Sequence, residues 1–241
     1  MSLKGKVAII TGASRGIGAG VARAFAADGC LIAGIARDTH ALNSVAEEIT
    51  SKGGEFLPVI ADVTKEEEIE GAIKEILAKT GRIDILVNNA GIALYKPCLD
   101  MTVAEWQRVI DVNLRGVYIC THAVLPYMVE RGEGHIIFVS SDAGKFTFSG
   151  GSAYNVSKHG VQEFAATLRK ELEGRGVKIT TICPGGVATE ILGPLPDLPP
   201  GERYKSLTVD ELADVILFTA SRPPTVNVDD LMVHFSAQQR K

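Results

Sequence analysis

The amino-acid sequence predicts an α/β protein with a single, doubly wound domain, in which a seven-stranded parallel sheet carries helices on both faces. The length of 241 residues suits one such domain better than two. Short apolar runs alternate along the chain with segments of helical periodicity. Several of the runs are apolar throughout, as expected of strands that are covered on both faces.

Strands and helices are expected to alternate along the chain. Runs rich in β-branched residues predict strands at 6–10, 31–36, 56–60, 83–88, 135–140, 177–182 and 231–235. Apolar residues at helical spacing predict helices at 16–28, 39–52, 65–79, 103–130, 153–174 and 209–220. The stretch GPLPDLPPGE at 193–202 holds four of the ten prolines, so we expect an irregular loop there that covers a site.

Composition and charge argue against several classes of protein. The formal net charge is −4, and no stripe of Lys and Arg suggests a nucleic-acid partner. No apolar run reaches the roughly 18 residues of a membrane span, and the start, MSLKGKVAII, lacks the features of a signal peptide. The four cysteines show no C-x-x-C spacing and the five histidines no ligand spacing. We therefore expect a cytoplasmic protein with reduced thiols and no metal site.

A glycine-rich turn follows the first expected strand. The stretch TGASRGIG at 11–18 has glycines at positions 12, 16 and 18. Where side chains are absent, a phosphate can approach backbone N–H groups closely, and the N-terminus of the following helix adds partial positive charge. We interpret the turn as a dinucleotide site because it follows the first strand of an α/β pattern. A plain glycine-rich turn is the alternative.

Tyr154 and Lys158 stand four residues apart in the stretch YNVSKHG. On a helix this spacing puts them one turn apart on the same face. Many helices carry such a pair by chance, and a proton-transfer site is the other interpretation. In that case the ammonium of Lys158 would stabilise the phenolate and lower the pKa of Tyr154 from the ordinary value of about 10. The phenol could then take or give a proton during a reaction.

Six motifs decide between these interpretations: TGASRGIG at 11–18, NNAG at 88–91, VNLRG at 112–116, VSS at 139–141, Tyr154 with Lys158, and PGGVAT at 184–189. The order of these motifs and the distances between them are similar to those of the short-chain dehydrogenase/reductase family, and the resemblance covers nearly the whole sequence. The resemblance implies one Rossmann-fold domain over residues 1–241. Its cofactor half would be about 1–130, its catalytic and substrate half about 131–241, and its substrate loop about 188–208.

The resemblance also implies four catalytic residues. Tyr154 would be the general acid/base, and Lys158 would support it and hold the nicotinamide ribose. Ser141, which precedes the tyrosine by thirteen residues, would bind the substrate oxygen as charge develops on it. Ser140 would point to the opposite face of its strand and make a structural hydrogen bond. Asn113 would hold a water that links Lys158 to solvent.

The cofactor is expected to be NADP(H). At the end of the second strand, NAD-using relatives carry an acid where this chain has Ala36, and Arg37 follows it. Arg15 is a second cation that could pair with a 2′-phosphate. Asp38 has a spacing that suits a ribose-binding acid, but we interpret it as the N-cap of the next helix. The expected cofactor-binding residues are Gly12, Ser14, Arg15, Gly16, Ile17, Gly18, Arg37, Asp62, Val63, Asn89, Ala90, Gly91, Tyr154, Lys158, Pro184, Gly185, Val187 and Thr189.

Within that set the resemblance gives some residues particular roles. Asp62 would contact the adenine amine, although it could instead cap the helix that begins near Lys65. Asn89 to Gly91 would line the central cleft of the cofactor site. Val187 would contact the nicotinamide carboxamide, and Thr189 the pyrophosphate.

The expected function is hydride transfer between NADP(H) and a small carbonyl compound or secondary alcohol. The C-terminal stretch RPPTVNVDDLMVHFSAQQRK resembles reductases of hydroxy acids, hydroxy amino acids or simple ketones more than enzymes of acyl-carrier thioesters. A 3-oxoacyl-[acyl-carrier-protein] reductase, a non-catalytic NADP-sensing regulator, and an isomerase or dehydratase are the alternatives. The substrate wall would be 94–97, 142–151 and 190 to about 200, which is largely apolar, with Lys96 and Lys145 close by. The family also implies a homo-oligomer, either a dimer or a tetramer.

Overall fold

The computed structural model describes residues 2–193 and 205–236. In this part of the chain, parallel strands form one sheet in the order β3-β2-β1-β4-β5-β6-β7. The strands are β1 (Val7–Thr11), β2 (Leu31–Ala36), β3 (Glu55–Ile60), β4 (Ile85–Asn88), β5 (Gly134–Val139), β6 (Val177–Pro184) and β7 (Asp230–Val233). The strand order reverses between β1 and β4, which is where ligands bind in open α/β sheets. The predicted seven-stranded parallel sheet is confirmed.

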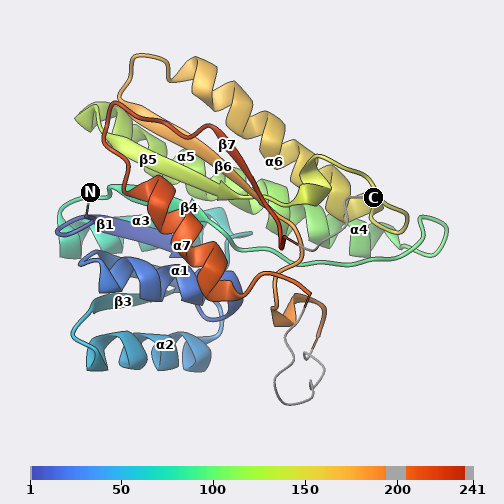
Figure 1. The fold of residues 1–241 in the computed structure, drawn as a ribbon, viewed down its shortest axis with the longest axis horizontal. Coiled ribbons are helices and arrows are strands. Elements are labelled where there is room, and N and C mark those ends of the chain that lie inside the picture. Colours follow the sequence, from blue (N-terminus) through green and yellow to red (C-terminus); the bar gives the residue numbers. More distant parts are fainter. Residues whose placement is uncertain (1, 194–204, 237–241) are drawn as a thin grey trace.

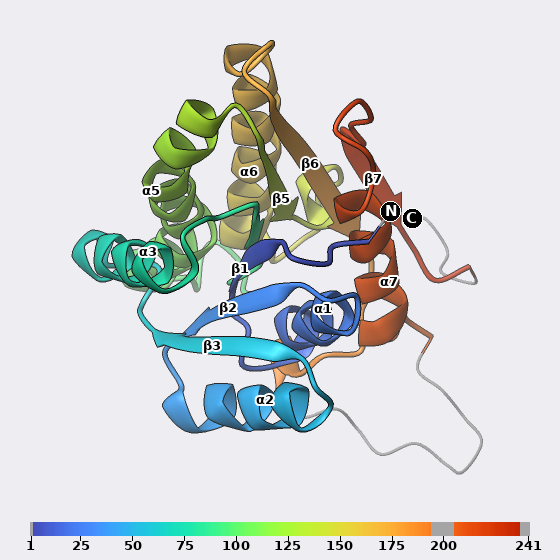
Figure 2. The same cartoon turned by 90° about the vertical axis from the view of Figure 1, so that its left-hand side faces the viewer.

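Helices cover both faces of the sheet (Figures 1 and 2). The α-helices are α1 (Gly16–Ala27), α2 (Thr39–Ser51), α3 (Glu66–Thr80), α4 (Val103–Ile110), α5 (Gly116–Arg131), α6 (Ser152–Glu171) and α7 (Val209–Ala220). Figure 2 shows α1, α2 and α7 on one side of the sheet and α3, α5 and α6 on the other. Short 3₁₀ turns lie at Asp142–Gly144 (η2) and Glu190–Leu192 (η3).

The two faces of the sheet belong to two separate apolar cores. In β1, Ile9 packs into the core that contains residues of α3, α5 and α6. Its neighbours Ala8 and Ile10 pack into the core under α1, α2 and α7. All three side chains are fully buried, because successive residues of a strand point to opposite faces. This is the physical reason why the central strands read as unbroken apolar runs.

The boundaries of the elements agree with the sequence pattern to within a few residues. The strand at 31–36 and the helix at 209–220 lie where they were predicted. The strand predicted at 83–88 begins only at Ile85, and the one predicted at 177–182 continues to Pro184. The proline-rich stretch predicted as a loop lies outside the described residues, apart from Gly193.

The helix predicted at 103–130 contains a π-helical turn, η1 (Asp111–Arg115), between α4 and α5. The backbone N–H of Gly116 donates to the carbonyl oxygen of Asp111, five residues earlier. The wider turn holds one more residue than an α-helical turn, and such turns occur frequently at functional sites. Asn113 lies within it and is 1% exposed.

Two absences can be stated for the part of the chain that the structure describes. None of its helices is both long enough and apolar enough to cross a bilayer. Among the same residues, no three His, Cys, Asp or Glu side chains gather in a way that could hold a metal ion.

A buried carboxylate joins the amino ends of β1 and β4. Asp84, whose side chain is 3% exposed, accepts a hydrogen bond from the Val7 backbone N–H at 2.8 Å. Arg82 donates to both of its carboxylate oxygens, at 2.5 and 2.8 Å, and Arg131 donates to one of them at 3.2 Å. Burial alone would raise the pKa of Asp84, but these hydrogen bonds and the nearby Lys6 outweigh it and lower the pKa.

Asp84→Ala should therefore lower the free energy of unfolding by about 3–5 kcal/mol, because it leaves buried donors and charges without their partner. Chemical denaturation measures the change. The control is Glu75→Ala, which removes an exposed ion pair with Lys79 on α3 and should cost less than about 0.5 kcal/mol. Equal effects of the two substitutions would contradict the structural role of Asp84.

Candidate active site

The predicted site residues gather at the carboxyl ends of the central strands. The glycine turn follows β1, Asn89–Gly91 follow β4, Ser141 follows β5, and Gly185 follows β6. Tyr154 and Lys158 approach from the first turns of α6. These strands are neighbours in the sheet, so segments far apart in the sequence meet at one edge, on either side of the point where the strand order reverses.

The glycine turn is packed closely against the end of β4. Gly12 has a φ of 68°, and a Cβ on it would lie 3.0 Å from the Cα of Ala90. A Cβ on Gly18 would collide with the carbonyl oxygen of Gly12 and lie 2.6 Å from Nδ2 of Asn89. Both positions therefore require glycine, the first for its backbone conformation and both for lack of space.

Thr11 holds the two strand ends together, and its role was not foreseen from the sequence. Its Oγ1 accepts hydrogen bonds from the backbone N–H groups of Asn89 and Ala90, each at 3.0 Å. Asn89 Nδ2 donates to the carbonyl oxygen of Thr11 at 2.9 Å. The threonine at the start of the TGASRGIG motif was the available signal, because a hydroxyl at a strand end can satisfy neighbouring backbone N–H groups.

The N-terminus of α1 has the properties of an anion site. Its N-cap, Arg15, is exposed and makes no side-chain capping bond, and the first turn carries no acidic residue. The first backbone N–H groups of a helix have no partner within it, and its dipole favours negative charge there. Ser14 and Ile17 are half-buried beside this turn. These features are compatible with the predicted pyrophosphate site, which stays a prediction.

The segment after β6 reaches the same turn. A Cβ on Gly16, whose φ is 52°, would lie 3.5 Å from Cγ2 of Thr189, so Thr189 stands against the glycine turn. Pro184 is the last residue of β6, and the Gly185 N–H donates to the carbonyl oxygen of Val233. Val187 pairs with Leu207 in an isolated bridge. The predicted residues of PGGVAT thus lie along one wall of the site.

The ends of β2 and β3 place a cation where a second phosphate group could be recognised. Arg37 is exposed, and its Nη1 lies 3.4 Å from Oδ2 of Asp62. Asp38 accepts a hydrogen bond from the Ala41 N–H at 3.0 Å and is the N-cap of α2. The interpretation of Asp38 as a cap is confirmed, and Ala36 leaves no other acid at the end of β2.

Asp62 has a different local role from the cap considered in the sequence analysis. The N-cap of α3 is Lys65, and Asp62 instead accepts hydrogen bonds from the N–H and the hydroxyl of Thr64, each at 2.9 Å. Burial opposes ionisation of Asp62, but the bonds from Thr64 and the charge of Arg37 outweigh it and lower the pKa. Val63 is buried and packs on the first residue of α5, Gly116.

Tyr154 and Lys158 lie side by side on α6. The tyrosine is 8% exposed and the lysine 6%. Lys158 Nζ lies 5.7 Å from the centroid of the Tyr154 ring and donates a hydrogen bond to the carbonyl oxygen of Val139 at 3.0 Å. A Cβ on Gly91 would lie 3.8 Å from the same nitrogen. The structure thus brings the predicted pair together at the end of the NNAG motif.

The expected direction of the Tyr154 pKa is wrong for the protein as the structure describes it. Burial raises the pKa of Tyr154, and the nearby Tyr95 and Asp142 raise it further, whereas a hydrogen bond with Ser141 only partly opposes this. Burial also lowers the pKa of Lys158 to about 8. The spacing of Tyr154 and Lys158 predicts that the two side chains meet, but not that they are buried. Burial removes them from water and disfavours both the phenolate and the ammonium.

The two serines after β5 make different contacts, and the structural hydrogen bond expected of Ser140 is present. Ser140 Oγ donates to the carbonyl oxygen of Lys158 at 3.1 Å, which is a structural bond to α6. Ser141 is buried on the site side, where its hydroxyl interacts with Tyr154. Ser141 Oγ also accepts from the Ala143 N–H and donates to Oδ1 of Asp142, each at 3.1 Å.

Asn113 faces the interior, as its apolar neighbours suggested. Its Oδ1 accepts from the Ile92 N–H at 2.8 Å, and its Nδ2 donates to the Ile92 carbonyl oxygen at 2.9 Å. The same Nδ2 also lies 3.1 Å from Oγ of Ser157 on α6. Asn113 therefore joins the loop after β4 to α6.

Aromatic rings stand beside Tyr154. The ring of Tyr95 is perpendicular to that of Tyr154, with centroids 5.6 Å apart, and makes a similar contact with Phe148 at 5.3 Å. From the sequence, Tyr95 and Phe148 fell within ranges predicted to form the substrate wall. Their mutual contact depends on loops that meet only in the folded chain, so no sequence signal gave it.

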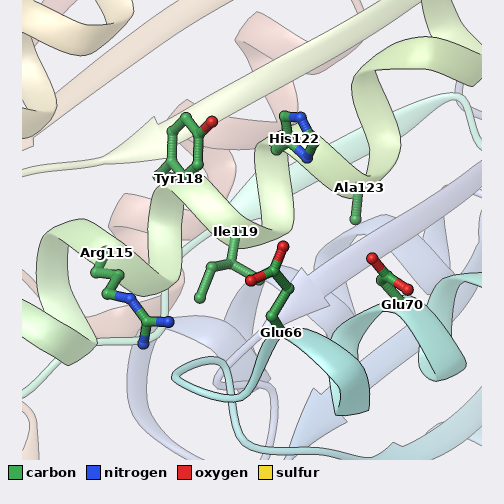
Figure 3. Close-up of a pocket in the computed structure, with 7 residues that line it drawn as sticks. All are labelled: Glu66, Glu70, Arg115, Tyr118, Ile119, His122 and Ala123. Carbon is green, nitrogen blue, oxygen red and sulfur yellow. The ribbon is translucent and has the colours of Figure 1, made fainter.

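A pocket on another part of the surface is separate from this site. It lies between α3 and the start of α5 (Figure 3), and its lining residues are Glu66, Glu70, Arg115, Tyr118, Ile119, His122 and Ala123. None of them is a predicted catalytic or cofactor-binding residue.

Comparison with known proteins agrees with this arrangement. Residues 6–198 match the family model described as short chain dehydrogenase. A 3-oxoacyl-[acyl-carrier-protein] reductase of Synechocystis sp. is 40% identical over 247 residues, which cover 97% of this chain and 99% of that protein. Glycine betaine reductase ATRR of Emericella nidulans is 35% identical over 96% of this chain, but the match spans only 19% of that longer protein.

Solved structures give the same result. An alcohol dehydrogenase from the archaeon Thermococcus sibiricus, complexed with 5-hydroxy-NADP, superposes with a TM-score of 0.90 at 32% identity. The match covers 98% of this chain and 99% of that one. Together with the fold and the family model, these similarities show that the chain belongs to the short-chain dehydrogenase family.

Proposed function

We propose that the protein is an NADP(H)-dependent oxidoreductase that interconverts a small carbonyl compound and the corresponding secondary alcohol. The observation that carries the proposal is the meeting of Ser141, Tyr154 and Lys158 at the carboxyl edge of the sheet, with Lys158 Nζ 5.7 Å from the Tyr154 ring. The glycine turn that fits a dinucleotide lies at the same edge. A non-catalytic NADP sensor would not need this pair to be retained.

When bound, NADP(H) would supply or accept the hydride, and side chains of this protein would transfer the proton. The Tyr154 hydroxyl gives its proton to the carbonyl oxygen during reduction, or takes the proton of the alcohol during oxidation. The hydroxyl of Ser141 donates a hydrogen bond to the same oxygen as negative charge develops. The ring of Tyr154 is largely buried, which keeps bulk water from competing for this proton.

Lys158 is proposed to supply positive charge beneath the phenol. An ammonium has three donors, and one of them is used by the carbonyl oxygen of Val139. The others can serve the Tyr154 hydroxyl and a ribose hydroxyl of the cofactor. A cofactor carrying positive charge, together with this ammonium, would oppose the effect of burial on the Tyr154 pKa. The water relay expected at Asn113 remains a prediction, and the clamp on Ile92 supports a positioning role for that side chain.

NADP(H) is favoured over NAD(H) by the residues at the ends of β1 and β2. Arg37 and Arg15 are exposed cations beside the glycine turn, and Asp38, the acid that follows Arg37, is engaged as the cap of α2. The ion pair of Arg37 with Asp62 is long, at 3.4 Å, and exposed, so it would not prevent Arg37 from pairing with a 2′-phosphate. The Thermococcus sibiricus relative with 5-hydroxy-NADP supports the same choice.

A second candidate function is the reduction of a 3-oxoacyl thioester on an acyl-carrier protein. The 40% identical relative from Synechocystis sp., which matches over 99% of its length, favours it. The C-terminal sequence of this chain argues for a smaller substrate, and that preference remains a prediction.

The cellular setting and assembly are also proposals. Cys30, Cys98, Cys120 and Cys183 are free thiols, which supports a reducing compartment such as the cytoplasm. Exposed apolar side chains on helices, Tyr118 and Val156 at 52% and 51% and Phe218 on α7 at 52%, support a homo-oligomer that would cover them.

Tyr154→Phe should reduce turnover by roughly 10²–10⁴-fold, because it removes the proton donor and keeps the ring. NADPH binding should stay within about twofold of the original protein. The measurements are NADPH absorbance with a panel of ketones and aldehydes, and fluorescence titration of NADPH. Tyr127→Phe, an exposed tyrosine on α5, is the matched control. Undiminished turnover by the Tyr154 variant would rule out the proposed acid/base.

NADPH should bind about 10–100-fold more tightly than NADH, the range expected for charge-assisted bonds to one phosphate. Arg37→Ala should remove most of this difference, whereas Arg175→Ala, at an exposed arginine, should not. Adding Ala36→Asp to Arg37→Ala should shift the preference toward NADH. Fluorescence titration measures each affinity, and equal binding of the two cofactors by the original protein would refute the role of Arg37.

Lys158→Met should abolish turnover and yet stabilise the fold. Burial lowers the pKa of Lys158 from 10.5 to about 8, which corresponds to at most about 3 kcal/mol of cost for burying the ammonium. Below pH 8 the Lys158 amine is protonated in both the folded and the unfolded state. The original protein then bears the whole cost of burying the charge, and the variant is more stable by that amount. The gain should fade between pH 8 and 10.5, as the amine becomes neutral in both states. Urea unfolding at pH 7 and pH 10 tests this, and a less stable variant at pH 7 would contradict it.

A further inference from the structure

The carboxylate of Asp142 lies next to Ser141, the proposed catalytic serine. Asp142 follows Ser141 directly, and its Oδ1 accepts the hydrogen bond from the Ser141 hydroxyl at 3.1 Å. Its side chain is 32% exposed. The negative charge of Asp142 raises the pKa of both Tyr154 and Tyr95, so the carboxylate lies close enough to affect both phenols. Since Ser141 is proposed to bind the substrate oxygen, its hydrogen bond to Asp142 puts this carboxylate beside the space proposed for the reacting carbonyl group.

The cations that the sequence places nearest to this space are already paired with other carboxylates. Lys96 Nζ lies 3.0 Å from both carboxylate oxygens of Glu105. Lys145 forms an ion pair with Asp230 on β7. Among residues 2–193 and 205–236, Asp142 forms an ion pair with His234, whose Nε2 is 3.7 Å from Oδ2 and which is charged only when protonated. Glu105 and Asp230 lie outside the predicted substrate wall and offset the charges of Lys96 and Lys145. In the part of the chain that the structure describes, the wall and these two partners together therefore carry more carboxylates than amines.

Aromatic rings complete the surroundings. Tyr95 stands perpendicular to Tyr154 and nearly perpendicular to Phe148, with interplanar angles of 90° and 82°. Tyr95 and Phe148 are 45% and 43% exposed, so a ligand can reach them. The charge of Asp142 acts on Tyr95, and aromatic rings with a carboxylate within electrostatic reach are surroundings in which proteins hold an organic cation, through cation–π attraction and charge.

We infer that the site selects a carbonyl or alcohol substrate that carries a positively charged amine one or two carbons from the reacting carbon, with Asp142 and the ring of Tyr95 as the groups that recognise it. This inference rests on the proposed function and names its substrate class. In oxidation, hydride leaves the carbinol carbon for NADP⁺ and the hydroxyl proton goes to Tyr154, while the ammonium keeps its charge. A substrate with a carboxylate in the same place would face Asp142 and be disfavoured.

The test compares three secondary alcohols of similar size with NADP⁺: 1-amino-2-propanol (cationic), 2-butanol (neutral) and 3-hydroxybutyrate (anionic). We expect kcat/KM for the cationic alcohol to exceed that for the neutral one by about 10-fold or more, as for a partly desolvated cation beside aromatic rings, and the anionic alcohol to be the poorest. Equal values, or a preference for the anion, would overturn the inference while leaving the proposed function intact.

Variants show whether Asp142 is responsible. Asp142→Asn should lower the ratio of kcat/KM between 1-amino-2-propanol and 2-butanol by about 10-fold, and Asp142→Glu should restore part of it. The ratio is used because the bond to Ser141 also changes in both variants. Asp214→Asn, at an exposed carboxylate on α7, is the matched control and should leave the ratio unchanged. An unchanged ratio in Asp142→Asn would overturn the role of Asp142.

A binding measurement separates this inference from the proposed function. Calorimetry with the protein and NADP⁺ compares choline with its neutral isostere, 3,3-dimethylbutan-1-ol, and needs no turnover. Tighter binding of choline, by about 10-fold and dependent on Asp142, would support the inference even if no alcohol were oxidised. Equal binding of the two compounds, together with an equal response to 1-amino-2-propanol and 2-butanol, would overturn it. A preference for 1-amino-2-propanol over choline would identify a primary rather than a quaternary ammonium as the recognised group.

Discussion

The close contact between the carboxyl ends of β1 and β4 is the constraint on which the site depends. Thr11 and Asn89 exchange hydrogen bonds across it, and Gly12 and Gly18 leave no room for a side chain. The contact fixes the position of the glycine turn relative to the NNAG segment at residues 88–91. Because α1 begins directly after this turn, the position of its N-terminal amides is fixed as well. The position of the proposed anion site thus depends on strand packing as well as on the loop.

From that contact a series of hydrogen bonds extends to α6, the helix that carries Tyr154 and Lys158. The loop after β4 is held at Ile92 by the side chain of Asn113, which also meets Ser157 on α6. Ser157 in turn donates to the carbonyl oxygen of Tyr154. Such continuous contacts position groups from separate elements within the tolerance that proton and hydride transfer demand. The glycine turn after β1 and the start of α6 are therefore parts of one connected unit.

Much of the fold and of the site could be predicted from the sequence because both rest on local patterns. Apolar periodicity gave the strands and helices, and the preference of Asp for N-caps gave the role of Asp38 at α2. What the sequence missed depends on neighbours distant along the chain. The direction of the Tyr154 pKa follows from burial, and the pairing of Lys96 with Glu105 depends on how a loop folds onto α4. The spacing of residues along the sequence indicates neither how deeply a side chain is buried nor which residues a loop contacts.

The π-helical turn at Asp111–Arg115 links the two halves of the long helical segment in a way that restricts insertions and deletions. An α-helix advances about 100° per residue, so loss of one residue from this turn would rotate α5 by that angle relative to α4. Val117 and Val124, now buried against the sheet, would swing toward water, while Asn113 would leave Ile92. The chain length between these positions is therefore as tightly fixed as the identity of the residues, and a one-residue shift there would disturb the core and the site together.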